Sequence, residues 1–132
     1  MTNEQPSHQQ VKDATAATEA TMRSQPVPVN AYETSGALVV VAPLPAVTPD
    51  DVTIELRDNC LRFWAHLRSA APRDYLISEW QYGGYEREID LPEGYGSDIE
   101  ASLHNGQLAI RVMKGTATSP LTVKPINGQA AF

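Results

Sequence analysis

The stretch ASLHNGQLAIRVMKG, residues 101–115, restricts the fold of this chain more than any other, because it places Asn105-Gly106 between two runs of alternating apolar and polar residues. Asn-Gly favours a two-residue type I′ turn, which needs positive φ at both positions. With this turn, the facing apolar pairs are Leu103–Leu108, Ala101–Ile110 and Ile99–Val112. A slip of one residue would turn these side chains outward, so the register is well specified. The sequence predicts an antiparallel hairpin with one buried and one solvent-facing side.

A second stretch, PDDVTIELRDNCLRFWAHL, behaves in the same way when Asp58-Asn59 is taken as the turn. The facing pairs are then Leu56–Leu61, Ile54–Phe63 and Val52–Ala65. One face is again apolar, as in a layer of a β-sandwich. Trp64 points to the other, polar side, where it either belongs to an interface or lies beneath a loop.

The run YEREIDLP carries a charge in an apolar row. Tyr85, Ile89 and Leu91 share one face of the expected strand with Arg87. An unpaired buried guanidinium costs several kcal/mol. Arg87 should therefore meet a carboxylate within the fold, or the row should be part of an interface.

Changes in composition and in the alternation of apolar and polar residues divide the chain into three parts. Residues 1–29 are polar and end in QPVPV, which predicts a flexible arm, with a plain solubilising tail as the alternative. Residues 30–114 contain short alternating runs separated by turn signals, which predict an all-β antiparallel sandwich of seven to eight strands. Residues 115–132 form a C-terminal extension: a short linker, GTATSP, is followed by LTV. Leu121 and Val123 are two positions apart, so on an extended segment their side chains point in the same direction. This suits a segment that adds as a strand to a sheet edge, and the alternative is an ordinary tail with two apolar residues.

The bulk composition argues against several classes of partner. The net charge is −6 and the ten basic residues are scattered, so we expect neither nucleic acid nor an anionic membrane as partner. The longest apolar stretch, ALVVVAPLPAV, is too short to span a bilayer and contains two prolines. A single cysteine, Cys60, allows no disulfide within the chain and fits a reducing compartment, so we expect a cytoplasmic protein.

The chain lacks a motif for catalysis or metal binding. His8, His66 and His104 have no ligand spacing to one another or to Cys60, so neither a metal nor another cofactor is expected. Asp50 and Asp51 follow Thr-Pro, where carboxylates commonly cap a turn. We therefore expect that the protein is not an enzyme.

The runs YGGYEREIDLPEGY and IEASLHNGQLAIRVMK resemble the second half of the α-crystallin domain of small heat-shock proteins of bacterial type. The run AYETSGALVVVAPLPAVTPDDVTIELRDNCLRF resembles its first half, so the resemblance covers about residues 30–114 and the LTV segment. It implies an immunoglobulin-like sandwich. It also implies an ATP-independent chaperone, or holdase, that binds non-native client proteins and forms a homodimer and larger homo-oligomers.

The resemblance also implies roles for particular residues. Leu121 and Val123 match a C-terminal anchor that docks between the edge strands of a neighbouring subunit. The residues expected to line that groove are Val52, Ile54, Leu56, Ala101 and Leu103. The residues expected at a dimer interface are Tyr75, Leu76 and Ile77, which form the centre of a strand swapped onto the partner, together with Arg87.

The chain departs from the family pattern at three places. Pro43-Leu44-Pro45-Ala46 stands where the family often has Asp-Leu-Pro-Gly, the arm 1–29 contains no aromatic residue, and Leu-x-Val is a smaller anchor than Ile-x-Ile. These departures imply a changed first loop and weaker assembly and docking. The alternative functions are an adaptor that binds one folded partner, like the CS-domain co-chaperones, and an enzyme or sugar-binding sandwich.

Overall fold

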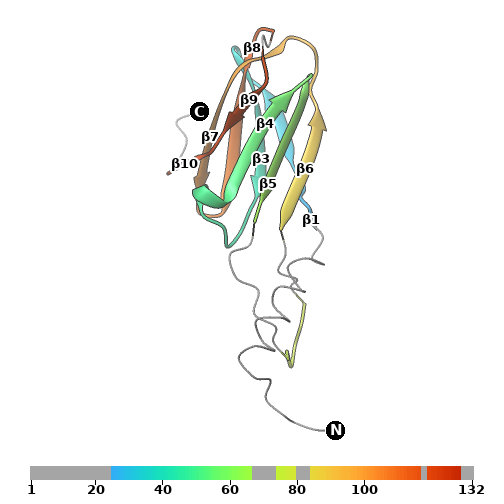
Figure 1. Cartoon of the computed structure of the whole chain (residues 1–132), viewed down its shortest axis with the longest axis vertical. Coiled ribbons are helices and arrows are strands. Elements are labelled where there is room, and N and C mark those ends of the chain that lie inside the picture. The colour runs from blue at the N-terminus through green and yellow to red at the C-terminus, as the bar shows by residue number, and fades with distance from the viewer. Residues whose placement is uncertain (1–24, 67–73, 80–83, 117–118, 129–132) are drawn as a thin grey trace.

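Two β-sheets pack face to face in this computed structural model, which describes residues 25–66, 74–79, 84–116 and 119–128 (Figure 1). The first sheet contains, in spatial order, β1 (Gln25–Pro26), β6 (Tyr85–Asp90), β5 (Cys60–Ala65), β4 (Val52–Arg57) and β9 (Leu121–Val123). The second contains β10 (Ile126–Asn127), β7 (Tyr95–His104), β8 (Gln107–Lys114), β3 (Ala37–Pro43) and β2 (Asn30–Glu33). The predicted all-β sandwich is confirmed, with β2 to β8 forming its body and β1, β9 and β10 as short additions.

Both predicted hairpins have the register that the sequence indicated. In the β7–β8 hairpin, Asn105 has φ 50° and Gly106 has φ 75°, as a type I′ turn requires, and Leu103 pairs with Leu108. In the β4–β5 hairpin the turn residues Asp58 and Asn59 also have positive φ. The facing pairs there are Leu56–Leu61, Ile54–Phe63 and Val52–Ala65.

The core lies between the two sheets and is built from the inward-facing residue of each alternating pair. Phe63, Ile54 and Leu108 are completely buried within one continuous apolar cluster. Leu44, in the loop after β3, is completely buried as well, and its amide donates to the carbonyl oxygen of Gly106 at 2.7 Å. The loop after β3 is thus tied to the β7–β8 turn.

The outer face of the second sheet is less exposed than the hairpin pattern predicted. Ser102 lies on the face expected to meet solvent, yet only 2% of its surface is exposed. At this position β10 pairs in parallel with β7, so that Ile126 lies beside Ser102. Nothing in the β7–β8 hairpin itself signals this added strand.

A short 3-10 helix, η1 (Pro49–Asp51), leads into β4. The amide and hydroxyl of Thr48 both donate to the Asp51 carboxylate, at 2.9 and 3.0 Å. This contact confirms the predicted capping role for Asp51, and it fixes where β4 begins.

Candidate functional site

The predicted docking residues lie on β4 and β7. Each of these is the last long strand of its sheet on the same side of the sandwich, followed only by the short strands β9 and β10. Strand alternation points these residues toward the core, and all belong to the same apolar cluster: Val52, Ile54, Leu56, Ala101 and Leu103. The strand β9 contacts both β4 and β7. We call the space between these two strands, which β9 fills, the edge groove.

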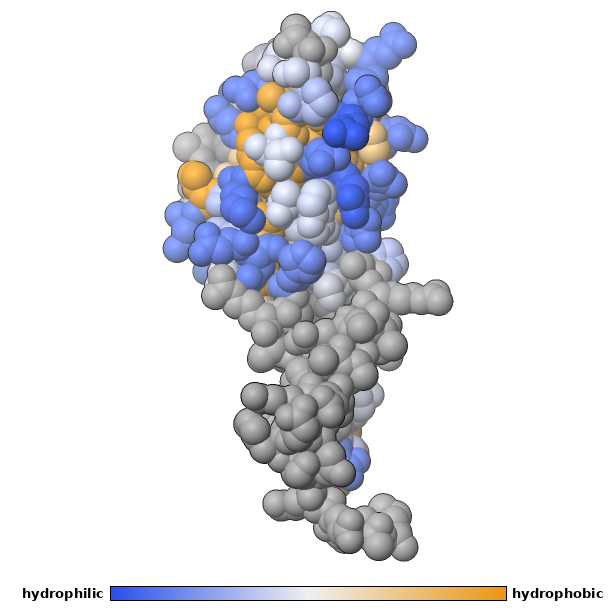
Figure 2. Space-filling model, viewed as in Figure 1, coloured by the Kyte–Doolittle hydropathy of each residue, from blue (hydrophilic) through white to orange (hydrophobic). Residues whose placement is uncertain are grey.

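Leu121 and Val123 are the two residues of β9 that enter the edge groove. In the antiparallel pair β4–β9, Leu121 lies opposite Leu56 and Val123 lies opposite Ile54. Both side chains are half-buried and pack against the core, whereas Thr122 between them is exposed. Figure 2 shows hydrophobic residues gathered on the face where β9 lies beside β4, with hydrophilic residues around them. The structure thus brings the predicted anchor and the predicted groove together.

In the single chain, β9 pairs with β4 of the same chain. A linker of six residues, 115–120, is long enough for this, because an extended chain of that length spans about 20 Å. Docking within one chain was therefore allowed by the sequence. The docking into a neighbouring subunit that the family resemblance implied is not tested by a single chain and stays a prediction.

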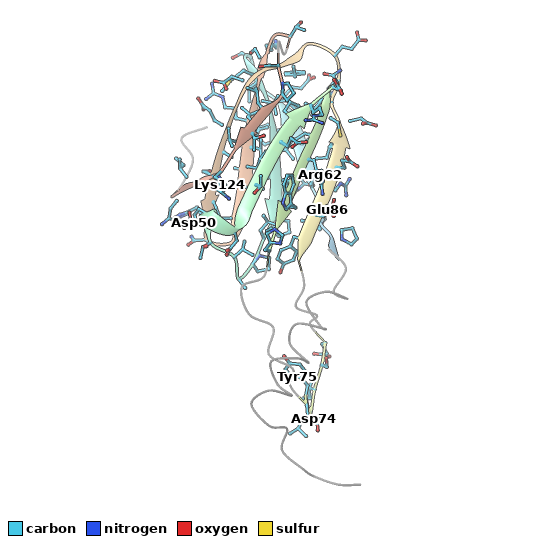
Figure 3. All side chains as sticks on the ribbon, in the orientation of Figure 1. Asp50, Arg62, Asp74, Tyr75, Glu86 and Lys124 are labelled. Atoms are coloured by element: carbon cyan, nitrogen blue, oxygen red, sulfur yellow. The ribbon has the colours of Figure 1, made fainter. Side chains whose placement is uncertain are left out.

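The tail beyond the anchor also contacts the sandwich, which sequence reasoning missed. The ammonium group of Lys124 donates to the carbonyl oxygens of Asp50, at 2.9 Å, and Val52, at 3.3 Å (Figure 3). Pro125 is buried, and β10 then pairs in parallel with β7. The amide of Gly128 donates to the carbonyl oxygen of Leu103 at 3.1 Å. The sequence around Pro125 gives little signal for this second strand, because of the two residues in β10 only Ile126 is β-prone.

The segment expected to swap between subunits is not a strand in the single chain. Tyr75, Leu76 and Ile77 lie in a bend whose side chains are exposed, with Leu76 entirely so. Figure 3 places Tyr75 away from the two sheets. Isolated strands need a partner for their backbone groups, so the β-prone residues of this segment cannot form a strand alone. The prediction that they lie in a dimer interface is not tested by a single chain.

Arg87 has a backbone partner among the described residues. Its guanidinium donates to the carbonyl oxygen of Val27 at 3.2 Å, and among the described residues no carboxylate is its partner. Val27 is only 2% exposed and follows β1, which pairs in parallel with β6. Arg87 therefore joins the end of the N-terminal segment to the edge of the first sheet, and any contact with a second subunit stays a prediction.

Trp64 lies on the outer face of the first sheet under an arginine. The guanidinium carbon of Arg62 is 4.4 Å from the centre of the indole ring, within cation–π distance. The same guanidinium donates to one Glu86 carboxylate oxygen, at 2.8 and 3.0 Å. Among the described residues, the ring is partly covered by this neighbouring side chain, and the two alternatives for Trp64, an interface or a place beneath a loop, stay predictions.

The described residues offer little for chemistry. Among them no three His, Cys, Asp or Glu side chains are grouped so that they could hold a metal ion. Burial raises the pKa of the Cys60 thiol, and the nearby carboxylates of Glu88 and Asp90 raise it further. A raised pKa makes the thiol a poor nucleophile at neutral pH. In the same part of the chain, no helix is long and apolar enough to cross a membrane.

Comparison with protein families gives a match over most of the chain. The model of the Hsp20/alpha crystallin family matches residues 30–127, which include β2 to β10. A 19.0 kDa class II heat shock protein of rice, Oryza sativa subsp. japonica, is 31% identical over 109 residues. That match covers 75% of this chain but only 62% of the rice protein. The chain therefore spans less than two thirds of this relative.

Solved structures show the same fold. The crystal structure of hspA from Xanthomonas axonopodis has a TM-score of 0.64 at 24% identity and covers 73% of this chain and 100% of that one. A small heat-shock protein from Xylella fastidiosa, described as having a distinct high order structure, has a TM-score of 0.63 at 24% identity. That similarity covers 75% of this chain and 94% of the Xylella chain.

Proposed function

The chain belongs to the Hsp20/alpha-crystallin family, and from this premise we propose that it is an ATP-independent holdase that binds unfolding proteins and prevents their aggregation. The observation that carries the proposal is the edge groove. It accepts an extended segment through backbone pairing with β4, while alternate apolar side chains of that segment reach the core. Binding of this kind needs neither a nucleotide nor a covalent step.

The recognition mode explains why such a site would suit unfolding proteins. Addition of a strand to a sheet edge derives affinity from main-chain hydrogen bonds, which any sequence can make. Pockets for alternate side chains then select apolar residues over charged ones. A denaturing protein exposes segments with both properties, whereas a folded protein has already paired its backbone groups. The site would therefore prefer non-native clients without reading a particular sequence.

We further propose that two chains associate through the segment 74–79. Three of its residues, Tyr75, Leu76 and Ile77, are exposed and apolar. Strand β2 is the four-residue edge of the second sheet, all of its residues are exposed, and Tyr32 is an exposed aromatic there. A homodimer in which each segment pairs with the partner's β2 would satisfy both backbones and cover these side chains. Arg87 remains a candidate residue for the same interface, and larger homo-oligomers would build on the dimer.

The cellular setting follows from the same reasoning. A single half-buried free cysteine, Cys60, fits a reducing compartment, which supports the proposal of a cytoplasmic protein. Clients would be released for refolding when they leave the edge groove, since no bond has to be broken. The activity is chaperoning rather than catalysis.

The test is heat-induced light scattering of a thermolabile model enzyme, without ATP, in the presence of rising amounts of this protein. We expect scattering to fall to near baseline at about one subunit per client molecule. An unrelated acidic protein of similar mass serves as the control. If scattering is unchanged while circular dichroism shows a folded sandwich, the holdase proposal is wrong and the single-partner adaptor takes its place.

A further inference from the structure

The dipeptide Asn-Gly occurs twice in this chain, at Asn105-Gly106 and at Asn127-Gly128. This dipeptide has a chemistry of its own, which the proposed function does not use. Because glycine has no Cβ, its backbone nitrogen can approach the side-chain carbonyl carbon Cγ of the preceding asparagine with little steric hindrance. The same reaction is therefore open to both pairs, and their surroundings in the fold decide which of them reacts.

The reaction is an intramolecular loss of ammonia. The glycine amide gives its proton to a base, and its nitrogen forms a bond to Cγ of the asparagine. The bond from Cγ to the side-chain nitrogen breaks, and that nitrogen takes up a proton and leaves as ammonia. Water then adds to one of the two carbonyl carbons of the resulting cyclic imide and opens the ring there. The product is aspartate or isoaspartate, and water is the one co-reactant.

Two conditions must be met before the ring can close. The glycine N–H must be free, because an amide that donates a hydrogen bond gives up its proton less readily. The asparagine backbone must also rotate so that the glycine nitrogen points at Cγ. Both conditions require the fold to open locally, and the free energy of such opening differs widely between a core element and a frayed end.

The β7–β8 hairpin holds the first pair firmly. Asn105 and Gly106 form its turn with φ 50° and 75°, between strands of ten and eight residues. The carbonyl oxygen of Gly106 also accepts a hydrogen bond from the amide of the buried Leu44, at 2.7 Å. Rotation of the Asn105 backbone would disrupt the adjoining pair His104–Gln107. The side chain of Asn105 is exposed, but its backbone is fixed by the second sheet.

The second pair is held much less firmly. Asn127 is exposed and ends β10, a strand of two residues that pairs with β7 (Figure 1). Apart from its chain neighbours, no described residue has an atom within 4 Å of the position of a Cβ on Gly128. The Gly128 amide donates to the carbonyl oxygen of Leu103 at 3.1 Å. Loss of this bond and of the short pairing frees the attacking nitrogen, whether β7 belongs to the same chain or to another copy.

We propose that Asn127 is a site of spontaneous deamidation, whereas the fold protects Asn105 in the same dipeptide. Either product adds a negative charge to β10. Isoaspartate also lengthens the backbone by one carbon atom, so the Gly128 amide loses its place opposite the Leu103 carbonyl oxygen. In the modified protein β10 therefore separates from β7. This modification is independent of any chaperone activity.

The experiment incubates the full-length protein at mildly alkaline pH in water labelled with heavy oxygen, and follows both asparagines by mass spectrometry of peptides. The label separates new product from deamidation that preceded the incubation. We expect Asn127 to react at least about tenfold faster than Asn105, because a two-residue strand opens at lower free energy than a core hairpin. In the urea-unfolded chain both should react at similar, higher rates. Equal rates in the folded protein, faster reaction at Asn105, or no product at Asn127 would overturn the proposal.

The role of the β10 pairing is tested by Pro125→Ser, which removes the buried ring that precedes β10. With circular dichroism showing a folded sandwich, the rate at Asn127 should rise severalfold and the rate at Asn105 should not change. An unchanged rate at Asn127 would mean that the pairing does not control the reaction.

The consequence for β10 is measured by hydrogen exchange at the Gly128 amide. The matched control is Asn127→Gln, whose longer side chain closes a ring far more slowly and should give no product at this site. We expect faster exchange in Asn127→Asp and in the incubated wild-type protein than in incubated Asn127→Gln. Equal exchange in all three would show that the modification does not release β10.

Discussion

Val123 lies directly opposite Ile54 in the antiparallel pair that joins the C-terminal tail to β4. Ile54 is completely buried and Val123 is half-buried, so the tail completes a part of the core that β4 alone leaves open. This pairing connects the stability of the sandwich with access to its candidate binding site. The consequences of that connection can be measured.

Replacement of the two anchor residues should open the edge groove. For Leu121→Ala/Val123→Ala we expect a loss of about 1–3 kcal/mol in the free energy of unfolding, because two half-buried side chains lose apolar contact. Hydrogen exchange at the amides of residues 54–56 should become faster. The matched control is Thr122→Ala, which changes the exposed side of the same strand. Equal exchange rates in both variants would show that the tail does not protect β4.

The loop after β3 contains a residue whose backbone conformation favours glycine. Ala46 has φ 67°, and this left-handed conformation costs a non-glycine residue roughly 1 kcal/mol or more. We expect Ala46→Gly to raise the melting temperature by a few degrees, corresponding to about 1 kcal/mol. Ala31→Gly in β2, where φ is not positive, should lower it instead. A destabilised Ala46→Gly variant would mean that the strain at this position is relieved by other contacts.

Gly115 should tolerate no side chain. Gly115→Ala places a Cβ 2.8 Å from the Cβ of Ser97, on a backbone with φ +117°. We expect a loss of about 2 kcal/mol or more in the free energy of unfolding, measured in urea. Gly36→Ala is the control, because no atom lies within 4 Å of its added Cβ. Similar effects at both positions would contradict the described path of the chain into the linker.

Cys60 should react slowly with alkylating reagents. Burial, with Glu88 and Asp90 nearby, raises the pKa of its thiol, so at pH 8 less of it is thiolate than in a free cysteine. The rate of reaction with iodoacetamide should therefore be lower than for the urea-unfolded chain and should keep rising at pH values where the unfolded chain has reached its plateau. Identical pH profiles for the folded and unfolded chains would refute the described environment of Cys60.

The segment 74–79 provides the test of the dimer. Leu76→Asp/Ile77→Asp places charges where the proposed interface needs apolar contact, so the mass from sedimentation equilibrium should fall toward that of one chain. Ser78→Asp adds a charge in the same segment without removing an apolar side chain and should change the mass less. If the wild-type mass is retained in the double variant, this segment does not join the subunits.

Much of the sandwich could be predicted from local patterns. The registers of both hairpins follow from Asn105-Gly106 and Asp58-Asn59, because the turn fixes which residues face one another and the apolar pairs leave one consistent choice. The position of Leu121 and Val123 beside β4 also agrees with the resemblance, whereas their role as an anchor between subunits stays a prediction. In each case the information lies within a few residues or in a motif.

The remaining features depend on contacts that no short pattern encodes. Strand β10 is two residues long, so its alternation carries no signal, and its partners Ser102 and Leu103 lie far from it in the sequence. The carbonyl oxygen of Val27 as partner of Arg87 comes from a segment 60 residues away. The pairing of β9 with β4 joins segments that lie far apart in the sequence, which the pattern Leu-x-Val alone does not encode.

The central claim is that unfolding proteins bind in the edge groove, and the oxidised Glu55→Cys/Thr122→Cys/Cys60→Ser variant tests it most directly. Its disulfide would hold β9 against β4, because Glu55 and Thr122 are direct partners in these strands, and reduction would release the same molecule. The measurement is the suppression of heat-induced light scattering of a disulfide-free model client, before and after reduction. We predict weak suppression by the oxidised form and recovery on reduction to the level of the Cys60→Ser protein. Equal suppression by the oxidised and reduced forms would contradict the account.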